Sequence, residues 1–407
     1  MFRLILSTSF LVLILVPAAE AATSSREYGL EWRAEFVPKE GVAEVTLEVV
    51  QGRSLLRAAD FAMDPERYTD VSGDGEVEVD GDRVRWSVPA EGGTLRFEHH
   101  VDHRRSSGSY DAKLTNDWAL VRLDDLFPAA RTTTRKGATS RASVQVTGPK
   151  GWSAESPYGA IDESLKAFEN PARDFDRPTG WLVAGDLGIR RSEIAGRKVA
   201  VAAPVGHGFR RTDMLALLSW TMPTLVAIFP SFPERVLIAG ARDEMWRGGL
   251  SGPGSLYIQA DRPLLSENDT SSLLHELVHV ATRLRAVRGD DWIVEGLAEY
   301  YSLEVLRRSG TITQRRFGRA IADLGAWSEA SDSLSTSQSK GPTTARAVGV
   351  MHNLDLEIRK VTGSRWTLDH VARDLVDADS PVSLERLAAA AEERMGKPSR
   401  VLAAEAD

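Results

Sequence analysis

The stretch Ser272-Leu273-Leu274-His275-Glu276-Leu277-Val278-His279-Val280 places His-Glu-x-x-His among apolar residues, directly after the polar run Asp269-Thr270-Ser271. Positions i and i+4 of a helix share one face, so both imidazoles can reach a single ion. The apolar flanks indicate a buried helix, where imidazole and carboxylate groups need partners. The segment therefore predicts a metal-binding helix, against the alternative of a core helix with two histidines.

A third ligand is expected from the segment Asp291–Tyr301, where Glu295 follows His279 by 16 positions. This spacing leaves room for a turn and an antiparallel helix. Two imidazoles and one carboxylate suit one zinc ion per chain and leave a position for water. Glu276 is the expected base, taking a proton from metal-activated water as a peptide bond is hydrolysed.

Glu299 lies one helical turn after Glu295. It could accept the free ring N–H of a ligating histidine, or it could be a solvated side chain. The sequence leaves both interpretations open.

The bulk properties set limits on partners and compartment. The chain has 407 residues, 42% of them hydrophobic and 27% charged, which suits a globular protein with two cores. A net charge of -8, with basic residues scattered, excludes a nucleic-acid partner. There is no cysteine, so disulfides and thiolate zinc ligands are excluded, and histidines and carboxylates must bind any metal.

Residues 1–21 have the features of a secretory signal peptide. Arg3 precedes an apolar run from Leu4 to Val16, and Ala19-Glu20-Ala21 is a small-residue cleavage site. The 13 residues of that run are fewer than the roughly 20 that a membrane-spanning helix needs. We expect a secreted or periplasmic protein with no stable membrane span after cleavage.

Two domains are predicted. Residues 24–192 contain short alternating runs, such as 43–49 and 83–88, separated by Gly- and Asp-rich breaks, which predicts an antiparallel β-sandwich-like domain. Residues 193–400 begin with short apolar strands and become helical from about Thr270, with a polar stretch from Ser328 to Thr344 that could border the site. The fold class is α+β.

The segment Trp292–Tyr300 resembles the Trp-x-x-Glu-Gly-x-x-x-Tyr pattern of the glutamate zincins, or gluzincins. The helical run 354–363, followed by Leu368-Asp369, is similar to the glycyl aminopeptidase-like family within that clan. The resemblance covers roughly 236–375. It implies a thermolysin-like, mainly helical zinc peptidase domain, with His275, His279 and Glu295 as zinc ligands and Glu276 as base.

The chain departs from the family pattern in two places. Related aminopeptidases carry an oxyanion-stabilising tyrosine on a later helix, but no tyrosine follows Tyr301, and Arg346 stands near the expected position. Arg346 could be the oxyanion donor or a solvated helix arginine, and His352 and His370 are rival donors. In relatives, the strand before the metal helix carries a glutamate that binds the free amino group of the substrate. The matching stretch of this chain, 254–258, has no acidic residue. Aminopeptidase and endopeptidase action therefore both stay open.

These observations predict a secreted zinc peptidase that acts on a peptide or protein substrate. An alternative from another class is a catalytically inactive gluzincin-like binding or scaffold protein in the periplasm, which the two departures favour and the intact Glu276 opposes. Hydrolysis of a non-peptide amide would use the same metal chemistry.

Overall fold

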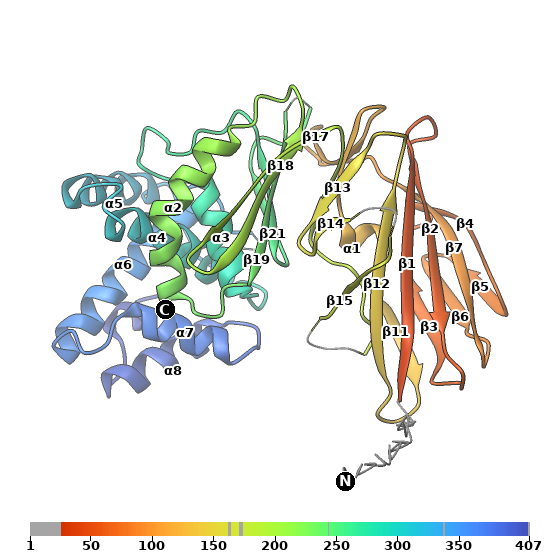
Figure 1. Ribbon diagram of the computed structural model, residues 1–407. Helices are drawn as coiled ribbons and strands as arrows, with labels where there is room; N and C mark the ends of the chain where they lie inside the picture. Colours follow the sequence, from red (N-terminus) through yellow and green to blue (C-terminus); the bar gives the residue numbers. More distant parts are fainter. Residues whose placement is uncertain (1–25, 162–163, 171–173, 243, 337, 406–407) are drawn as a thin grey trace, which may run out of the picture.

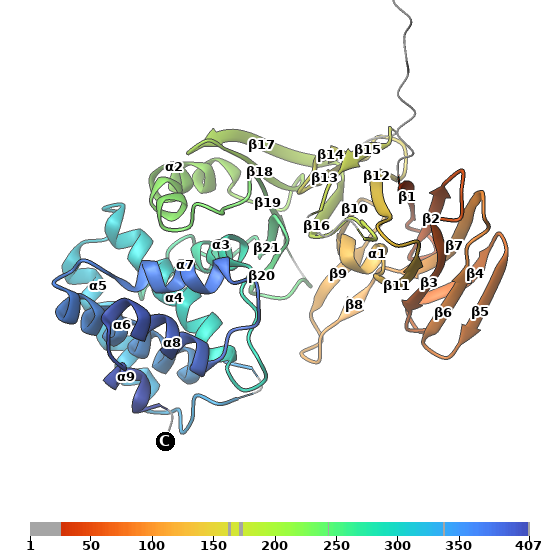
Figure 2. The same ribbon diagram turned by 90° about the horizontal axis from the view of Figure 1, so that it is seen from below.

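A computed structural model describes residues 26–161, 164–170, 174–242, 244–336 and 338–405. The described chain is rich in strands up to β16, Trp181–Gly185, and mainly helical from α3, Ser272–Thr282, onward, and the two halves lie side by side (Figures 1 and 2). The expected order, a β-rich region followed by a helical one, is confirmed. The predicted signal peptide, residues 1–21, lies outside the described residues.

Two sheets enclose the core of the β-rich half, where Trp32, Trp86 and Phe61 are fully buried. Alternate residues of their strands point inward, as the alternating runs predict. The larger sheet has the order β15-β12-β1-β2-β7-β4, with bounds Lys166–Phe168, Thr139–Thr147, Glu27–Val37, Val42–Val50, Gly92–His100 and Tyr68–Gly73. The smaller has the order β11-β3-β6-β5, with bounds Ala130–Thr134, Leu56–Ala62, Arg83–Ser87 and Glu76–Asp80.

The sequence pattern predicts an antiparallel β-domain, but the larger sheet contains one parallel pair of strands. Strands β1 and β12 run parallel, in register from Glu27 opposite Thr139 to Glu35 opposite Thr147. Side-chain alternation has the same period in both strand directions, so the sequence pattern could not reveal this pairing.

A third sheet joins the β-rich half to the rest. Its order is β14-β13-β16-β10-β9-β8, with bounds Gly159–Ile161, Ser153–Ser156, Trp181–Gly185, Trp118–Arg122, Tyr110–Leu114 and His103–Arg104. The short helix α1, Leu123–Leu126, follows β10. Trp181 and Leu120 of this sheet pack against Leu237 and Tyr257 of the next one, forming one apolar core between the two halves.

A fourth, mixed sheet forms the floor of the helical half. Its order is β17-β18-β19-β21-β20, with bounds Leu187–Ile194, Arg197–Pro204, Arg235–Ala241, Ser255–Gln259 and Gly249–Gly252. Strand β17 spans the expected domain boundary at residue 192 and pairs along its length with β18.

Helices cover the other face of this mixed sheet and continue to the end of the chain. Their bounds are Arg211–Ile228 for α2, Ser272–Thr282 for α3, Asp291–Arg308 for α4, Gln314–Ser328 for α5, Pro342–Thr362 for α6, Leu368–Asp377 for α7, Leu384–Met395 for α8 and Arg400–Ala403 for α9. The expected polar stretch is the connection between α5 and α6. Helices α3, α4 and α6 are packed through apolar residues such as Leu277, Leu297 and Val348.

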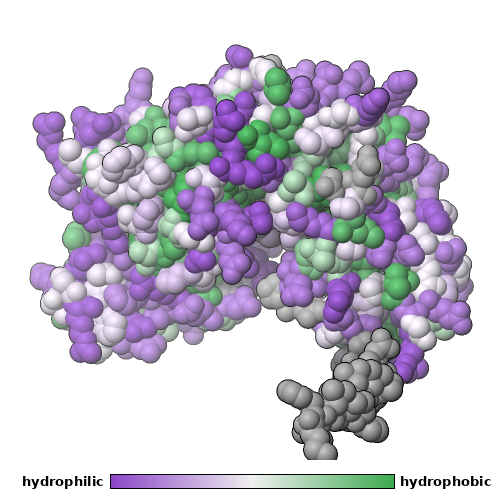
Figure 3. All heavy atoms as spheres, viewed as in Figure 1, coloured by the Kyte–Doolittle hydropathy of each residue, from purple (hydrophilic) through white to green (hydrophobic). Residues whose placement is uncertain are grey.

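Hydrophilic residues dominate the face seen in Figure 3, and its apolar residues form small, separate patches over both halves. Among the described residues, no helix combines the length and the apolar character needed to cross a bilayer.

Candidate metal centre

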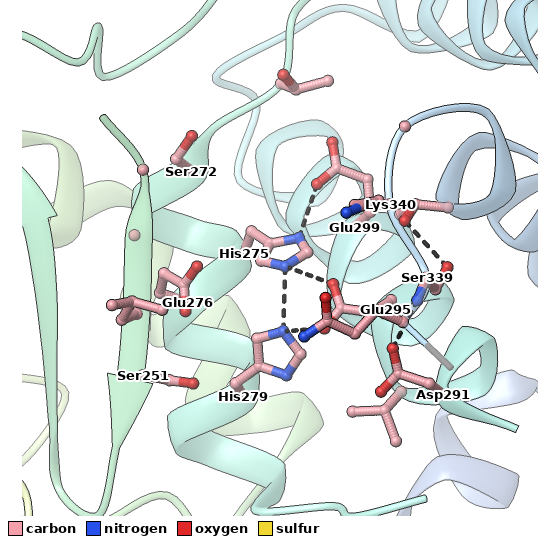
Figure 4. A pocket seen from close by; sticks show the side chains of 18 of the residues that line it. Ser251, Ser272, His275, Glu276, His279, Asp291, Glu295, Glu299, Ser339 and Lys340 are labelled. Atoms are coloured by element: carbon pink, nitrogen blue, oxygen red, sulfur yellow. Dashed lines mark hydrogen bonds and ion pairs between the residues drawn. The ribbon is translucent and has the colours of Figure 1, made fainter. Parts of the chain in front are cut away.

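Helix α3 carries the His-Glu-x-x-His motif as the sequence predicts. Its first turn is capped by Ser271, whose hydroxyl accepts a hydrogen bond from the backbone N–H of Leu274. It ends at Arg283, which adopts the left-handed conformation at φ 52°. Apolar residues bury its inner face, so the two histidines are held on the opposite face toward α4 (Figure 4).

Glu295 projects from the second turn of α4 toward both histidines (Figure 4). The Nε2 atoms of His275 and His279 lie 3.0 Å apart. The carboxylate oxygens of Glu295 lie 3.3 Å from Nε2 of His275 and 3.4 Å from Nε2 of His279. Within the described chain, these three residues form the one group that could hold a metal ion.

These separations fit one small tetrahedral cation. Zinc with bonds of about 2.05 Å to nitrogen and oxygen keeps tetrahedral ligands about 3.3 Å apart. The two ring nitrogens lie 3.0 Å apart, and each has a different carboxylate oxygen of Glu295 near that distance, at 3.3 and 3.4 Å. The side chains are therefore placed for a common ion without rearrangement of either helix.

Glu299 fixes the orientation of one ligand. Its Oε2 atom accepts a hydrogen bond from Nδ1 of His275 at 2.8 Å. That bond leaves Nε2 of His275 facing the other two ligands and determines which ring nitrogen is available to a metal. Of the two interpretations left open by the sequence, the contact with the histidine is the one observed.

The electrostatics of the group match a site for a cation. Burial and the nearby charge of His275 lower the pKa of His279 to about 4, so its ring is a neutral ligand near neutral pH. Burial opposes a charge on His275, but hydrogen bonds with Glu295 and Glu299 outweigh it and hold its pKa well above the usual value. A positive charge is thus stabilised among the carboxylates, and a bound metal ion would supply that charge.

Glu276 points away from α4, the helix that carries Glu295, and toward strand β20 (Figure 4). Its side chain is 8% exposed, and burial raises its pKa to about 7. His275 and hydrogen bonds from Ser251 partly offset this rise. A carboxylate with a pKa near 7 suits a group that accepts a proton from water and then donates it.

Strand β20 borders the centre, and sequence reasoning missed it. The expected stretch, 254–258, overlaps β21, which lies one strand further in. A Cβ atom at Gly249 would lie 2.5 Å from Cγ of Glu276, so the strand can pass this close only because residue 249 is glycine. Like the expected stretch, β20 has no acidic residue, since it reads Gly-Leu-Ser-Gly.

The centre opens into a cleft with a volume of about 830 Å³. Its walls are strand β20, helices α3 and α4, and the connection between α5 and α6. That connection is anchored beside the centre, because the backbone N–H of Ser339 donates to Asp291 of α4 at 2.7 Å. Among the described residues, no tyrosine lines this cleft.

The structure places the three candidate oxyanion donors outside the lining of the cleft. Arg346 lies on α6 and its guanidinium donates to Glu405 at 2.8 Å. His352 packs between the rings of Tyr300 and Phe317, and His370 belongs to the capping box of α7. We therefore assign none of them a role in the reaction.

The fold is a β-rich half joined to a helical half that carries two histidines and a glutamate on adjacent helices. No protein-family model and no curated protein matches the sequence.

Solved structures with this fold include an aminopeptidase N family protein from Idiomarina loihiensis, with a TM-score of 0.65 and 13% identity over 86% of this chain and 70% of that one. An M1 zinc metallopeptidase from Deinococcus radiodurans has a TM-score of 0.58 and 17% identity over 91% and 90% of the chains. Aminopeptidase A from Legionella pneumophila, solved with aspartic acid, has a TM-score of 0.58 and 14% identity over 93% of this chain and 49% of that one. At these identities the likeness defines the fold.

Proposed function

We propose that this chain is a zinc-dependent peptidase of the gluzincin type with a thermolysin-like helical half. The observation that carries the proposal is the convergence of two imidazoles and one carboxylate, His275, His279 and Glu295, with Glu276 directly after the first histidine on the same helix. The names of the three similar structures, all peptidases, support it. The narrower resemblance to the glycyl aminopeptidase-like family stays a prediction.

His275, His279 and Glu295 would hold the ion. When bound, zinc supplies Lewis-acid chemistry: it acidifies water and polarises a carbonyl group. Glu276, buried between α3 and β20, accepts the proton from the attacking water and passes it to the leaving amine. Glu299 keeps the ring of His275 in the orientation that binding needs.

The lining of the cleft favours substrates whose amino terminus is not bound by the protein. An ammonium group taken from water into a site needs a carboxylate partner. The acids that line the cleft are Glu276, Glu295 and Glu299 at the metal centre and Asp291, which accepts from Ser339. We therefore propose cleavage within peptides, and the predicted signal at residues 1–21 would place this activity outside the cytoplasm.

Zinc content and peptide cleavage of the purified protein test this function. We expect about one zinc per chain, and chelator-sensitive cleavage of a quenched peptide library. Glu276→Gln should keep the zinc and lose cleavage, whereas His279→Ala should lose both. Absence of zinc from the folded wild-type protein would contradict the proposal.

The absence of a tyrosine from the described lining of the cleft favours one second candidate, an inactive gluzincin-like binding protein. It predicts zinc binding without cleavage of any library member over a wide range of pH. For such a binding protein, Glu276→Gln would change the titration of the protein but neither its zinc content nor its lack of cleavage.

A further inference from the structure

Cationic side chains surround the metal centre. Five of the residues that line the cleft are Arg105, Arg247, Arg262, Arg285 and Lys340. They come from five separate segments of the chain, so no single sequence run reveals them. The whole chain, by contrast, has an excess of acidic over basic residues, 58 against 50.

Two of these cations are held in place by neighbours. The guanidinium of Arg105 lies 4.4 Å from the ring centroid of Trp246, which also lines the cleft. Arg262 donates to the hydroxyl of Ser272 at 2.6 Å, one turn before His275 on α3. Both charges are therefore held by contacts with other residues that line the cleft, Trp246 and Ser272.

The other three are available to a ligand. Arg247, Arg285 and Lys340 are exposed, and none of their side chains forms an ion pair within the described residues. Arg247 precedes β20, Arg285 follows α3, and Lys340 lies on the connection that faces β20 across the centre (Figure 4). They thus bring three separate segments of the chain to the cleft that holds the metal ligands.

The acidic residues of the cleft have a different distribution. Glu276, Glu295 and Glu299 are at the centre itself, and Asp291 is engaged by the backbone of Ser339. Outside the centre, the described lining is therefore positively charged, and a bound dication would add to that charge. A concave site of one sign concentrates ligands of the opposite sign.

We propose that the cleft recognises acidic peptides, with glutamate or aspartate side chains on both sides of the bond that reaches Glu276. This proposal rests on the peptidase function proposed above and specifies its substrate class. Arginine suits this role because its planar fork binds a carboxylate through two parallel hydrogen bonds. The lack of an acid on β20 agrees with it, since an acid there would repel such a peptide.

Direct binding tests the proposal without relying on turnover. The probe is an alanine-rich decapeptide with four glutamates and a neutral fluorophore, acetylated and amidated so that its ends carry no charge. The comparison peptide has lysines in place of the glutamates. Both are titrated with zinc-loaded Glu276→Gln protein, which cannot consume them, and fluorescence anisotropy reports binding.

A matched pair of variants assigns the binding to the cleft. The triple variant Arg247→Glu, Arg285→Glu, Lys340→Glu reverses the three available cations. The control variant Arg53→Glu, Arg57→Glu, Lys136→Glu changes the net charge equally on exposed residues of the β-rich half. Zinc content and circular dichroism establish that both variants are folded.

The acidic peptide should bind at least about tenfold more tightly than the lysine peptide, given three or more exposed ion pairs. The cleft variant should lose this preference, the control should retain it, and added salt should weaken it. Equal binding of both peptides, or equal loss in both variants, would overturn the inference while leaving cleavage by the wild-type protein to test the peptidase function. Selective binding of the acidic peptide without any cleavage would support the inference and remove the peptidase function.

Discussion

Gly249 and Glu276 are in such close contact that a β-carbon at residue 249 would lie 2.5 Å from Cγ and 2.9 Å from Oε1 of the glutamate. The edge strand and the proposed base therefore fit together only while residue 249 has no side chain. Either the strand or the carboxylate must move if one is added.

Gly249→Ala should lower kcat by about 100-fold or more, the range associated with loss of a general base, while zinc content stays unchanged. The measurement is steady-state cleavage of a quenched peptide beside elemental analysis. Gly252→Ala is the matched control on the same strand, because its β-carbon would meet Gly180 and Trp181 at an ordinary 3.4 Å. Equal activity of the two variants would contradict the proposed position of the base.

Glu299→Ala should weaken zinc binding by about 10- to 100-fold, because the hydrogen bond that orients His275 is lost. Glu299→Gln retains an acceptor oxygen without the charge and should fall between the wild type and the alanine variant. Competition with a chromogenic chelator gives the affinities. Unchanged affinity in the alanine variant would mean that the ring of His275 is positioned by packing alone.

Gly296, directly after the ligand Glu295, packs closely against Ala347 of α6. A β-carbon there would lie 2.7 Å from Cβ of Ala347. Gly296→Ala should lower the free energy of unfolding by about 1 kcal/mol or more through overpacking. Gly325→Ala, at a helical glycine with open space around it, should raise that free energy by up to about 1 kcal/mol. Urea unfolding followed by circular dichroism gives both values, and a stabilised Gly296→Ala would contradict the close contact.

The ion pair between Arg308 and Asp369 joins α4 to α7, with contacts of 2.6 and 3.0 Å. Asp369→Asn should lower the free energy of unfolding by about 2 kcal/mol at neutral pH, because Arg308 is left partly unpaired in a largely buried position. Glu78→Gln removes an exposed pair with Arg85 and should cost less than about 1 kcal/mol.

The same pair should show a defined pH dependence. Burial would raise the pKa of Asp369, but hydrogen bonds and charge from Arg308 outweigh burial and hold it below its usual value. A depressed carboxyl pKa stabilises the fold above the pKa of the unfolded chain, about 3.9, and this stability is lost as the pH falls through the folded value. The difference between wild type and Asp369→Asn should therefore stay constant down to about pH 5 and narrow below about pH 4. A difference that widened on acidification would contradict this sign.

The part of the centre that the sequence predicted is local to helices. His275 and His279 share a face because of helical periodicity, and Glu295 and Glu299 repeat the same relationship one helix later. Once α3 and α4 pack against each other, these four residues come into contact. A short motif could therefore identify the ligand group and the orienting carboxylate.

The remaining parts of the site depend on contacts between segments far apart in the chain. Strand β20 is four residues long and begins and ends with glycine, so no alternation marks it. Arg346 stands near the sequence position where related aminopeptidases carry a tyrosine, yet its direction depends on how α6 packs and on Glu405 near the end of the described chain. The cations of the cleft form no sequence motif, because each stands in a separate segment of the chain.

Trp181, fully buried at the end of the β-rich half, donates its indole N–H to the carbonyl of Leu250 at 2.8 Å, while its backbone N–H donates to Ser255 at the same distance. Strand β20, which contacts Glu276, is thus held in place by hydrogen bonds from the other half of the molecule. Replacement of the residues before Gly185, Trp181 included, would therefore change the position of β20 in the cleft. Every residue of the helical half that lines the cleft would stay the same. The geometry around Glu276 therefore depends on side chains from both halves of the molecule.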